Sequence, residues 1–558
     1  MKHGRILAKV LTVFLLASFS LGCNCTNNEG LWGAPAPTGL AALKVVLSAS
    51  DIQTSFAKTD THIVLNGDSA TVTGRGVIVN GSDITITTGG VYVMSGTLSD
   101  GQIAVDATKN DNVHIVLNGA SITNKSGSAV YASQCEKLVV TLAAGTKNAL
   151  IDGGANFYYT DIVEQEPNGA LFSKDDLTIN GDGSLMVTAG FKNGISTKDN
   201  LLILSGDVFV DAADNALYGK DSVAVLGGKL QLVAGGDGIK TNTIDDPLRG
   251  FVLLSGGDIS ITSDYDGVQA DTALEVTGAT LKVTAGEGAK GHENVPEVGS
   301  EGLKSNGSLS VTNGEVTVAS TGDCLRANGD MLLAGGLLSL STLGNAAQSG
   351  GLLSVTGGSI SVTQSFEGLE GISVNISDGF IDINAEDDAI NASGGADGVD
   401  KNGAVDCYVN ITGGDIRFIA HGDGVDSNGA ITMSGGTLYA FINSTPDNGA
   451  MDCDGALTVT GGILIYGGTG AGKTPDDTST QSYVHLEQAV AAGTALEVKK
   501  DGVELLGMNL PVDCTYLVIS IPEITMGKKY EFYSGLTLIH EVKAGTGGEF
   551  LGGRGKGN

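Results

Sequence analysis

The sequence predicts an all-β protein, a right-handed parallel β-helix with coils of ~22 residues, closed by a small C-terminal β cap. A short phrase with the order acid, small, aliphatic, polar recurs along the chain, as in Asp237-Gly238-Ile239-Lys240. After it come an apolar alternation, a Gly-Gly pair and a second alternation. Successive phrases are 22, 22, 29, 35, 22, 22, 22, 21, 35 and 26 residues apart, a period with insertions that is typical of a solenoid. The phrases begin at Asn193, Asn215, Asp237, Asp266, Glu301, Asp323, Asn345, Glu367, Asp388, Asp423 and Gly449.

Composition narrows the class of partner. The 558 residues exceed one compact core, which a solenoid accommodates because each coil packs on its neighbours. A formal net charge of −32 argues against nucleic acid and against direct binding to an anionic membrane, and it favours cations or neutral polymers. The seven cysteines form no Cys-x-x-Cys pair, so a zinc site is not expected.

The N-terminus is predicted to be a targeting segment. Residues 1–22 place basic side chains before an apolar run that is too short to span a bilayer. Ser20-Leu21-Gly22-Cys23 resembles a bacterial lipoprotein box, which predicts lipidation of Cys23; the alternative is a plain secretory signal. In both cases we expect the mature protein to leave the cytoplasm. The lipoprotein interpretation predicts an extracellular monomer at the cell surface, with membrane contact through the lipid anchor alone. Residues 23–44 are expected to be a flexible tether.

The rest of the chain divides by its periodicity. Residues 45–480 are assigned to the β-helix, with regular coils from about 169 and early coils of open function before them. Three short apolar runs per unit predict three strands per coil. The Gly-Gly pairs are expected at corners with positive φ, and Gly238 is expected to turn the chain. Residues 481–545 are expected to cap the helix and 546–558 to be a disordered Gly-rich tail.

The longer steps are interpreted as loops that leave the helix, at 243–250, 286–300 and 393–406. Insertions on a solenoid tend to build its binding face. The last of them carries Asp397, Asp400 and Asp406, which could join a site.

Stacking converts the acidic positions into a ladder on the outside of the helix. Equivalent residues in successive coils lie ~4.8 Å apart. Like charges at that spacing repel by roughly 0.8 kcal/mol in bulk water and ~3 kcal/mol at an effective dielectric of 20, so we expect a role beyond stability. Calcium, which accepts carboxylate and carbonyl oxygens, is the predicted cofactor; the alternative is a solvated acidic stripe. The candidate metal ligands are Asp214, Asp237, Asp264, Asp266, Asp271, Glu301, Asp323, Glu367, Asp387, Asp388, Asp423 and Asp426.

A second ladder is predicted three positions after the first, and its middle is basic. It could pair with the acids, or it could grip a polysaccharide through Lys240, Gln269, Lys304 and Arg326. In a lyase, Lys240, Lys304 or Arg326 would be the base, but each is an ordinary ladder member, so no catalytic residue is predicted. The ladder comprises Ser196, Tyr218, Lys240, Gln269, Lys304, Arg326, Gln348, Glu370, Asn391, Asp426 and Asp452.

Several phrases resemble those of a known family. They are the runs 172–181, 236–240, 386–392, 422–429 and 450–455. The sequence resembles, over roughly 150–545, a bacterial extracellular carbohydrate-binding β-helix family that is similar in fold to calcium-dependent pectate lyases. The resemblance implies calcium along the helix and binding of cellulose-like or pectin-like polysaccharide without cleavage. A polysaccharide lyase, or a surface stalk or adhesin without a specific sugar ligand, are the rival functions.

Overall fold

The protein is all-β. The structure, a computed structural model, describes residue 43 and residues 45–290, 300–393, 407–444, 447–470 and 472–545. In these ranges the strands are accompanied by two 3-10 turns, Gly154–Asn156 and Gly288–Lys290. No helix in them is long and apolar enough to cross a bilayer. The all-β prediction is confirmed. The predicted signal segment, Cys23, the tail and the acids Asp397, Asp400 and Asp406 lie outside the described residues.

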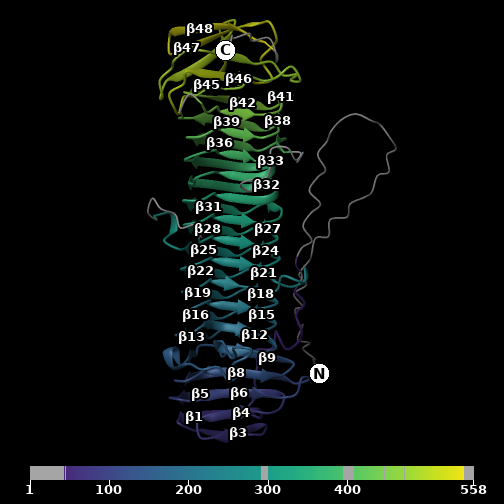
Figure 1. The fold of residues 1–558 in the computed structure, drawn as a ribbon, viewed down its shortest axis with the longest axis vertical. Helices are drawn as coiled ribbons and strands as arrows, with labels where there is room; N and C mark the ends of the chain where they lie inside the picture. The colour runs from purple at the N-terminus through teal and green to yellow at the C-terminus, as the bar shows by residue number, and fades with distance from the viewer. Residues whose placement is uncertain are drawn as a thin grey trace, which may run out of the picture. The chain divides into compact units, whose positions relative to one another are not determined.

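The repeating part consists of three columns of short strands, and strands in one column pair in parallel and in register. The first column follows the phrase: β11 (Gly169–Ser173), β14 (Asn193–Thr197), β17 (Leu217–Gly219), β20 (Ile239–Lys240), β23 (Val268–Ala270), β26 (Leu303–Ser305), β29 (Leu325–Ala327), β34 (Ile390–Ala392), β37 (Val425–Ser427) and β40 (Met451–Cys453). The second column holds β12 (Asp176–Gly181), β15 (Asn200–Ile203), β18 (Ser222–Val225), β21 (Phe251–Leu254), β24 (Ala273–Val276), β27 (Ser308–Val311), β30 (Met331–Leu333), β35 (Tyr408–Ile411), β38 (Ala430–Met433) and β41 (Leu457–Val459). The third column holds β10 (Lys147–Ile151), β13 (Ser184–Ala189), β16 (Asp207–Ala212), β19 (Lys229–Ala234), β22 (Asp258–Ser263), β25 (Thr280–Ala285), β28 (Glu315–Ser320), β31 (Leu337–Thr342), β36 (Asp415–Ala420), β39 (Thr437–Ile442) and β42 (Ile463–Gly468). Figure 1 labels strands of two of these columns, among them β12 and β13.

Two long strands, β32 (Ala347–Gln364) and β33 (Leu369–Ala385), pass through all three columns. The first coils differ from the repeat, because the hairpins β1–β2 and β3–β4 pair antiparallel while other early strands pair parallel. The sheet as a whole is therefore mixed. The early strands are β1 (Thr61–Gly67), β2 (Ala70–Thr73), β3 (Val77–Asn80), β4 (Asp83–Ile86), β5 (Gly90–Leu98), β6 (Gln102–Asp106), β7 (Asn112–Thr123), β8 (Val130–Gln134) and β9 (Lys137–Leu142).

The core lies inside the coils and is aliphatic. Alternate residues of each strand point inward, so β22 buries Ile259 and Ile261 while Asp258 stays exposed. The aliphatic position of the phrase is buried in each coil, as at Ile239 and Val268. Burying such side chains contributes a stabilising free energy of about 25 cal/mol per Å² of apolar area removed from water.

Glycines fit the corners in two different ways. The second glycine of a Gly-Gly pair has positive φ, +78° at Gly436, where a Cβ would lie 2.6 Å from backbone atoms of Gly413. This confirms the predicted corners. The chain bends at Gly238, as predicted, although this glycine does not have positive φ. A Cβ there would lie 2.5 Å from the carbonyl oxygen of Gly267, so the phrase needs a small residue because adjacent coils approach closely.

The C-terminal part covers the last coil. β46 (Tyr516–Ser520) pairs antiparallel with β42 and with β43 (Val484–Leu486). A separate antiparallel sheet follows (Figure 1). Its core merges with outward residues of the last coils such as Phe441 and Ile465. Its strands are β44 (Ala495–Lys500), β45 (Val503–Asn509), β47 (Lys529–Ser534) and β48 (Thr537–Lys543).

Candidate functional site

The first residues of the phrases form a hydrogen-bonded ladder, which we call the rung ladder. In most steps of the ladder the side-chain oxygen of one rung accepts the backbone N–H of the next. Asn215 Oδ1 accepts from Asp237 at 3.0 Å, and Asp237 Oδ1 accepts from Asp266 at 3.0 Å. The same bond joins the pairs Asp266 and Glu301, Asp323 and Asn345, Asn345 and Glu367, Asp388 and Asp423, and Asp423 and Gly449.

The rung ladder is largely buried, which corrects the expectation that it lies on the outside. Asp237 is 4% exposed and Asp323 is 8% exposed. A buried backbone N–H must have an acceptor, and an Asp or Asn side chain at this offset provides one. The repeated acid therefore has a structural role in closing each coil onto the next, a role that the sequence pattern did not reveal.

The second ladder has the predicted register. Lys240 pairs with Gln269 across β20 and β23, Gln269 with Lys304, and Lys304 with Arg326. The same register continues through Glu370, Asn391, Asp426 and Asp452. The two ladders thus lie side by side along the first column.

In the lower part of the first column, the basic residues neutralise the rungs. Lys304 Nζ lies 3.2 Å from Asp266 and 3.1 Å from Glu301, and Arg326 lies 3.0 Å from Asp323. Lys240 forms the equivalent ion pair within its own phrase. Burial alone would lower the pKa of Lys304, but attraction to Asp266 and Glu301 raises it, so this lysine is charged at neutral pH.

Side-chain amides replace the cations in the middle coils. Gln348 donates to Glu370 at 2.7 Å, Asn345 donates to the same carboxylate at 2.6 Å, and Asn391 donates to Glu367 at 3.0 Å. Burial, and then repulsion by Glu370, raise the pKa of Glu367 to about 8. These amides hold two carboxyl groups beside each other without a cation.

The upper coils bring carboxylates together without basic partners. Oxygens of Asp423, Asp426 and Asp452 all lie within 4.8 Å of one another. Burial, and then repulsion by Asp423 and Asp452, raise the pKa of Asp426 to about 6. Burial also raises the pKa of Asp388 to about 7, with Asp387 and Asp423 adding repulsion. Among the described residues, none of these five carboxylates has a Lys or Arg within ion-pair distance.

A buried amide oxygen adds to this group, which we call the upper acid cluster (Asp387, Asp388, Asp423, Asp426 and Asp452). Asn391 is 8% exposed and stands in register with Asp426. Its Oδ1 has no hydrogen-bond donor in the described part of the chain. A buried oxygen without a donor is costly, and a cation would satisfy it.

The other predicted ligands are placed differently. Asp214 faces Lys192 at 3.7 Å, Asp264 is exposed, and Asp271 lies at the far end of β23, where it accepts from Asn306 at 3.0 Å. Asp452 was not among the predicted ligands, although its place in the second ladder beside Asp426 was a usable signal.

Comparison with known proteins gives the family. A family model described as a carbohydrate-binding domain-containing protein matches residues 80–346 and 340–505. The chain belongs to this carbohydrate-binding domain family. The early coils from residue 80, which lack the acidic phrase, are part of the match.

Two known proteins are similar to this chain. A carbohydrate-binding domain-containing protein of Acetivibrio thermocellus is 33% identical over 196 residues, which are 35% of this chain and 68% of that protein. A solved structure, the polysaccharide lyase-like protein from C. thermocellum as a gadolinium derivative, is 34% identical. The similarity covers 45% of this chain and 96% of that chain, with a TM-score of 0.41.

Proposed function

We propose that this protein is an extracellular, calcium-dependent carbohydrate-binding protein, a right-handed parallel β-helix that binds plant cell-wall-type polysaccharide without cleaving it. Cellulose or pectin-type polygalacturonate is the ligand, and the protein acts as a monomer anchored to the cell surface through Cys23. Membership of the carbohydrate-binding domain family supports a polysaccharide partner. Parallel, in-register pairing within each column supports the β-helix.

The upper acid cluster carries the calcium proposal. Its donors are oxygens only, which suits a hard cation, and calcium takes 6–8 oxygen ligands and tolerates mixed carboxylates and amide carbonyls. Asp423, Asp426 and Asp452 supply carboxylates, and Asn391 supplies an amide oxygen that otherwise has no donor. These four residues would hold the ion. The lower rungs do not need one, because Lys240, Lys304 and Arg326 neutralise them.

Bound calcium would supply positive charge on a strongly acidic surface. The carboxylate of a uronate sugar would otherwise be repelled by a chain of net charge −32. This electrostatic argument supports the proposed dependence on calcium for acidic polysaccharides such as polygalacturonate.

The test is polygalacturonate binding by the full chain, with and without a chelator. We expect retention in calcium, loss in chelator, and loss in the double variant Asp426→Asn/Asp452→Asn. Asp237→Asn is the matched control, because that rung faces Lys240 and Asn already serves as a rung at position 215. Equal retention with and without chelator would refute the calcium dependence.

A polysaccharide lyase is the second candidate, because Lys304 and Arg326 stand beside carboxylates. A general base must be uncharged, and the ion pairs of Lys304 favour its charged form. We therefore expect no ultraviolet-absorbing unsaturated uronate from polygalacturonate with calcium. Steady product formation that Lys304→Ala abolishes would establish the lyase instead. If no polysaccharide retains the protein, a surface stalk or adhesin is the candidate function that remains.

A further inference from the structure

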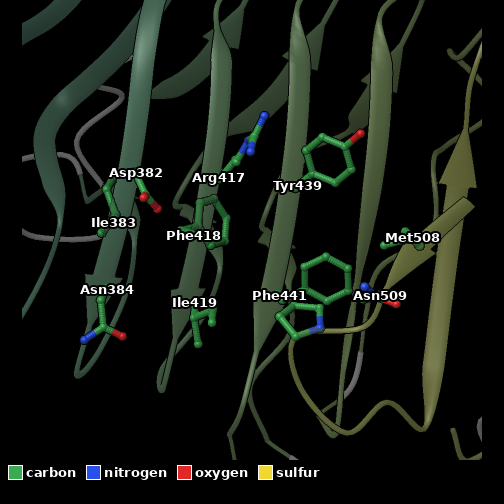
Figure 2. A pocket seen from close by; sticks show the side chains of 11 residues that line it. Asp382, Ile383, Asn384, Arg417, Phe418, Ile419, Tyr439, Phe441, Met508 and Asn509 are labelled. Carbon is green, nitrogen blue, oxygen red and sulfur yellow. The ribbon is translucent and has the colours of Figure 1, made fainter. Parts of the chain in front are cut away.

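A groove opens on the outer face of the third column, where the C-terminal sheet ends. It has a volume of about 450 Å³, within the roughly 300–1,000 Å³ usual for ligand pockets. Figure 2 shows Asp382 and Asn384 of β33, Arg417 of β36 and Tyr439 of β39 side by side on adjacent strands, with Met508 approaching from β45. The groove lies on a different column from the two ladders.

The strand register gives the groove a regular floor. Asp382, Arg417 and Tyr439 occupy the same position on three consecutive parallel strands, so their side chains are spaced at ~4.8 Å. The neighbours Ile381 and Ile416 are buried, which places the three on the outer side. A carboxylate, a guanidinium and a phenol ring thus form one row.

Arg417 is held in place by its neighbours. Its Nε donates to Asp415 Oδ1 at 3.2 Å and its Nη2 donates to Oδ2 at 3.0 Å. Its guanidinium carbon lies 5.7 Å from the ring centroids of both Phe380 and Tyr439. The two bonds to Asp415 use two of the five N–H donors of the guanidinium, which leaves donors for a ligand in a fixed orientation.

Charge and shape select the ligand. Asp382 and Asp415 together outweigh the single positive charge of Arg417, so an anionic sugar is disfavoured in the groove. An aromatic ring beside hydrogen-bonding side chains suits a sugar ring, which has apolar C–H faces and polar hydroxyl edges. Apolar Met508, from the C-terminal sheet, completes one wall.

We propose that this groove binds a hexose unit of a neutral polysaccharide, a β-linked glucan, independently of calcium. Tyr439 stacks on the sugar ring, Asp382 accepts hydroxyl protons, and Arg417 donates to hydroxyl oxygens. The proposal rests on the proposed carbohydrate-binding function and deepens it: acidic polysaccharide is bound through calcium at the upper acid cluster and neutral glucan at the groove.

The test measures binding of cellohexaose to the full chain in chelator by calorimetry. We expect Tyr439→Ala and Arg417→Ala each to weaken binding at least tenfold, and Tyr439→Phe to retain most of it. Phe209→Ala is the matched control, because Phe209 is an exposed aromatic residue of the same column on β16, in another coil. Circular dichroism and thermal unfolding of each variant check that the fold is intact.

Polygalacturonate binding in calcium separates this proposal from the general one. The Tyr439→Ala variant should still bind polygalacturonate in calcium. The Asp426→Asn/Asp452→Asn variant should lose polygalacturonate binding and still bind cellohexaose. Unchanged cellohexaose affinity in both groove variants, or no cellohexaose binding by a wild-type protein that still binds polygalacturonate, overturns the groove proposal alone. If the wild-type protein binds neither cellohexaose nor polygalacturonate, both proposals are overturned.

Discussion

Asp323 bonds to the coil on its C-terminal side and to its own phrase at the same time. Its Oδ1 accepts the backbone N–H of Asn345 at 2.8 Å, and its Oδ2 accepts from Arg326 at 3.0 Å. The side chain is thus both the acceptor that closes one coil onto the next and the counter-ion of the second ladder. Burial raises the pKa of Asp323, while the hydrogen bond from Asn345 and the charge of Arg326 oppose the shift.

Asp323→Ala should destabilise the protein by about 2 kcal/mol or more, because it leaves a buried N–H and a cation without partners. Asp323→Asn should cost less, since its Oδ1 still accepts from Asn345. Thermal unfolding and amide exchange of the peptide containing Asn345 are the measurements. Glu315→Ala, at an exposed site on β28, is the control. If Asp323→Ala unfolds at the same temperature as the wild type, the rungs do not have the structural role of closing one coil onto the next.

Calcium removal should lower thermal stability. If calcium binds the folded state alone, a concentration of 100 Kd adds about 2.7 kcal/mol to the free energy of unfolding. Asp426→Asn/Asp452→Asn should abolish the rise in melting temperature on adding calcium, whereas Asp237→Asn should keep it. The same melting temperature in calcium and in chelator for the wild type would count against the upper acid cluster as a metal site.

The pH dependence of stability should change in Asp266→Asn. Burial, and then Glu301, raise the pKa of Asp266 from 3.8 to about 7, so the folded state holds its proton more tightly. The contribution of this tighter proton binding to the free energy of unfolding is fully present below pH 3.8 and is lost as pH rises through about 7. The amide of the Asp266→Asn variant does not titrate, which removes a slope of up to about 1.4 kcal/mol per pH unit.

The measurement is the difference in melting temperature between wild type and Asp266→Asn from pH 4 to pH 8, in chelator. Asn can replace this rung because Asn215 and Asn345 already accept the same kind of N–H. The melting temperature of Asp266→Asn should rise relative to that of the wild type as pH increases. A difference that is constant over the whole range would contradict the raised pKa.

The buried thiols should resist alkylation in the native protein. Burial raises the pKa of Cys135, Cys324 and Cys514 to about 12, so almost no thiolate forms at pH 8. Iodoacetamide should label their peptides in denaturant and leave them unlabelled in buffer, as read by mass spectrometry. Native labelling of Cys324 at the rate of a free peptide would show that this part of the core opens.

The period of the sequence was enough to predict the strand register, since residues one coil apart must stack. It therefore predicted correctly that Lys240, Gln269 and Lys304 line up. It could not show that Asp237 is buried, because periodicity gives the offset of a side chain and not the backbone N–H that it meets. For the same reason the sequence predicted the bend at Gly238 but not the close approach of Gly267, which also requires a glycine there.

The groove could not be predicted from the sequence. Its floor comes from three separate coils, and its wall comes from Met508 in a strand that follows a different pattern. Asp382, Arg417 and Tyr439 are the outward residues of ordinary alternating strands, so nothing in the local pattern distinguishes them. Only the position of the C-terminal sheet against the third column makes them neighbours of one cavity.

The hydrogen bonds between rungs also decide where the chain can be lengthened. Asp237 bonds to Asp266 across a step of 29 residues, and Asp266 bonds to Glu301 across a step of 35, with the geometry of the 22-residue step between Asp323 and Asn345. Each rung therefore restores the alignment of the coil after an insertion. A foreign peptide placed in the segment after Asn242 should be displayed on the surface without displacing the coils above or below it, which makes the scaffold suitable for grafting.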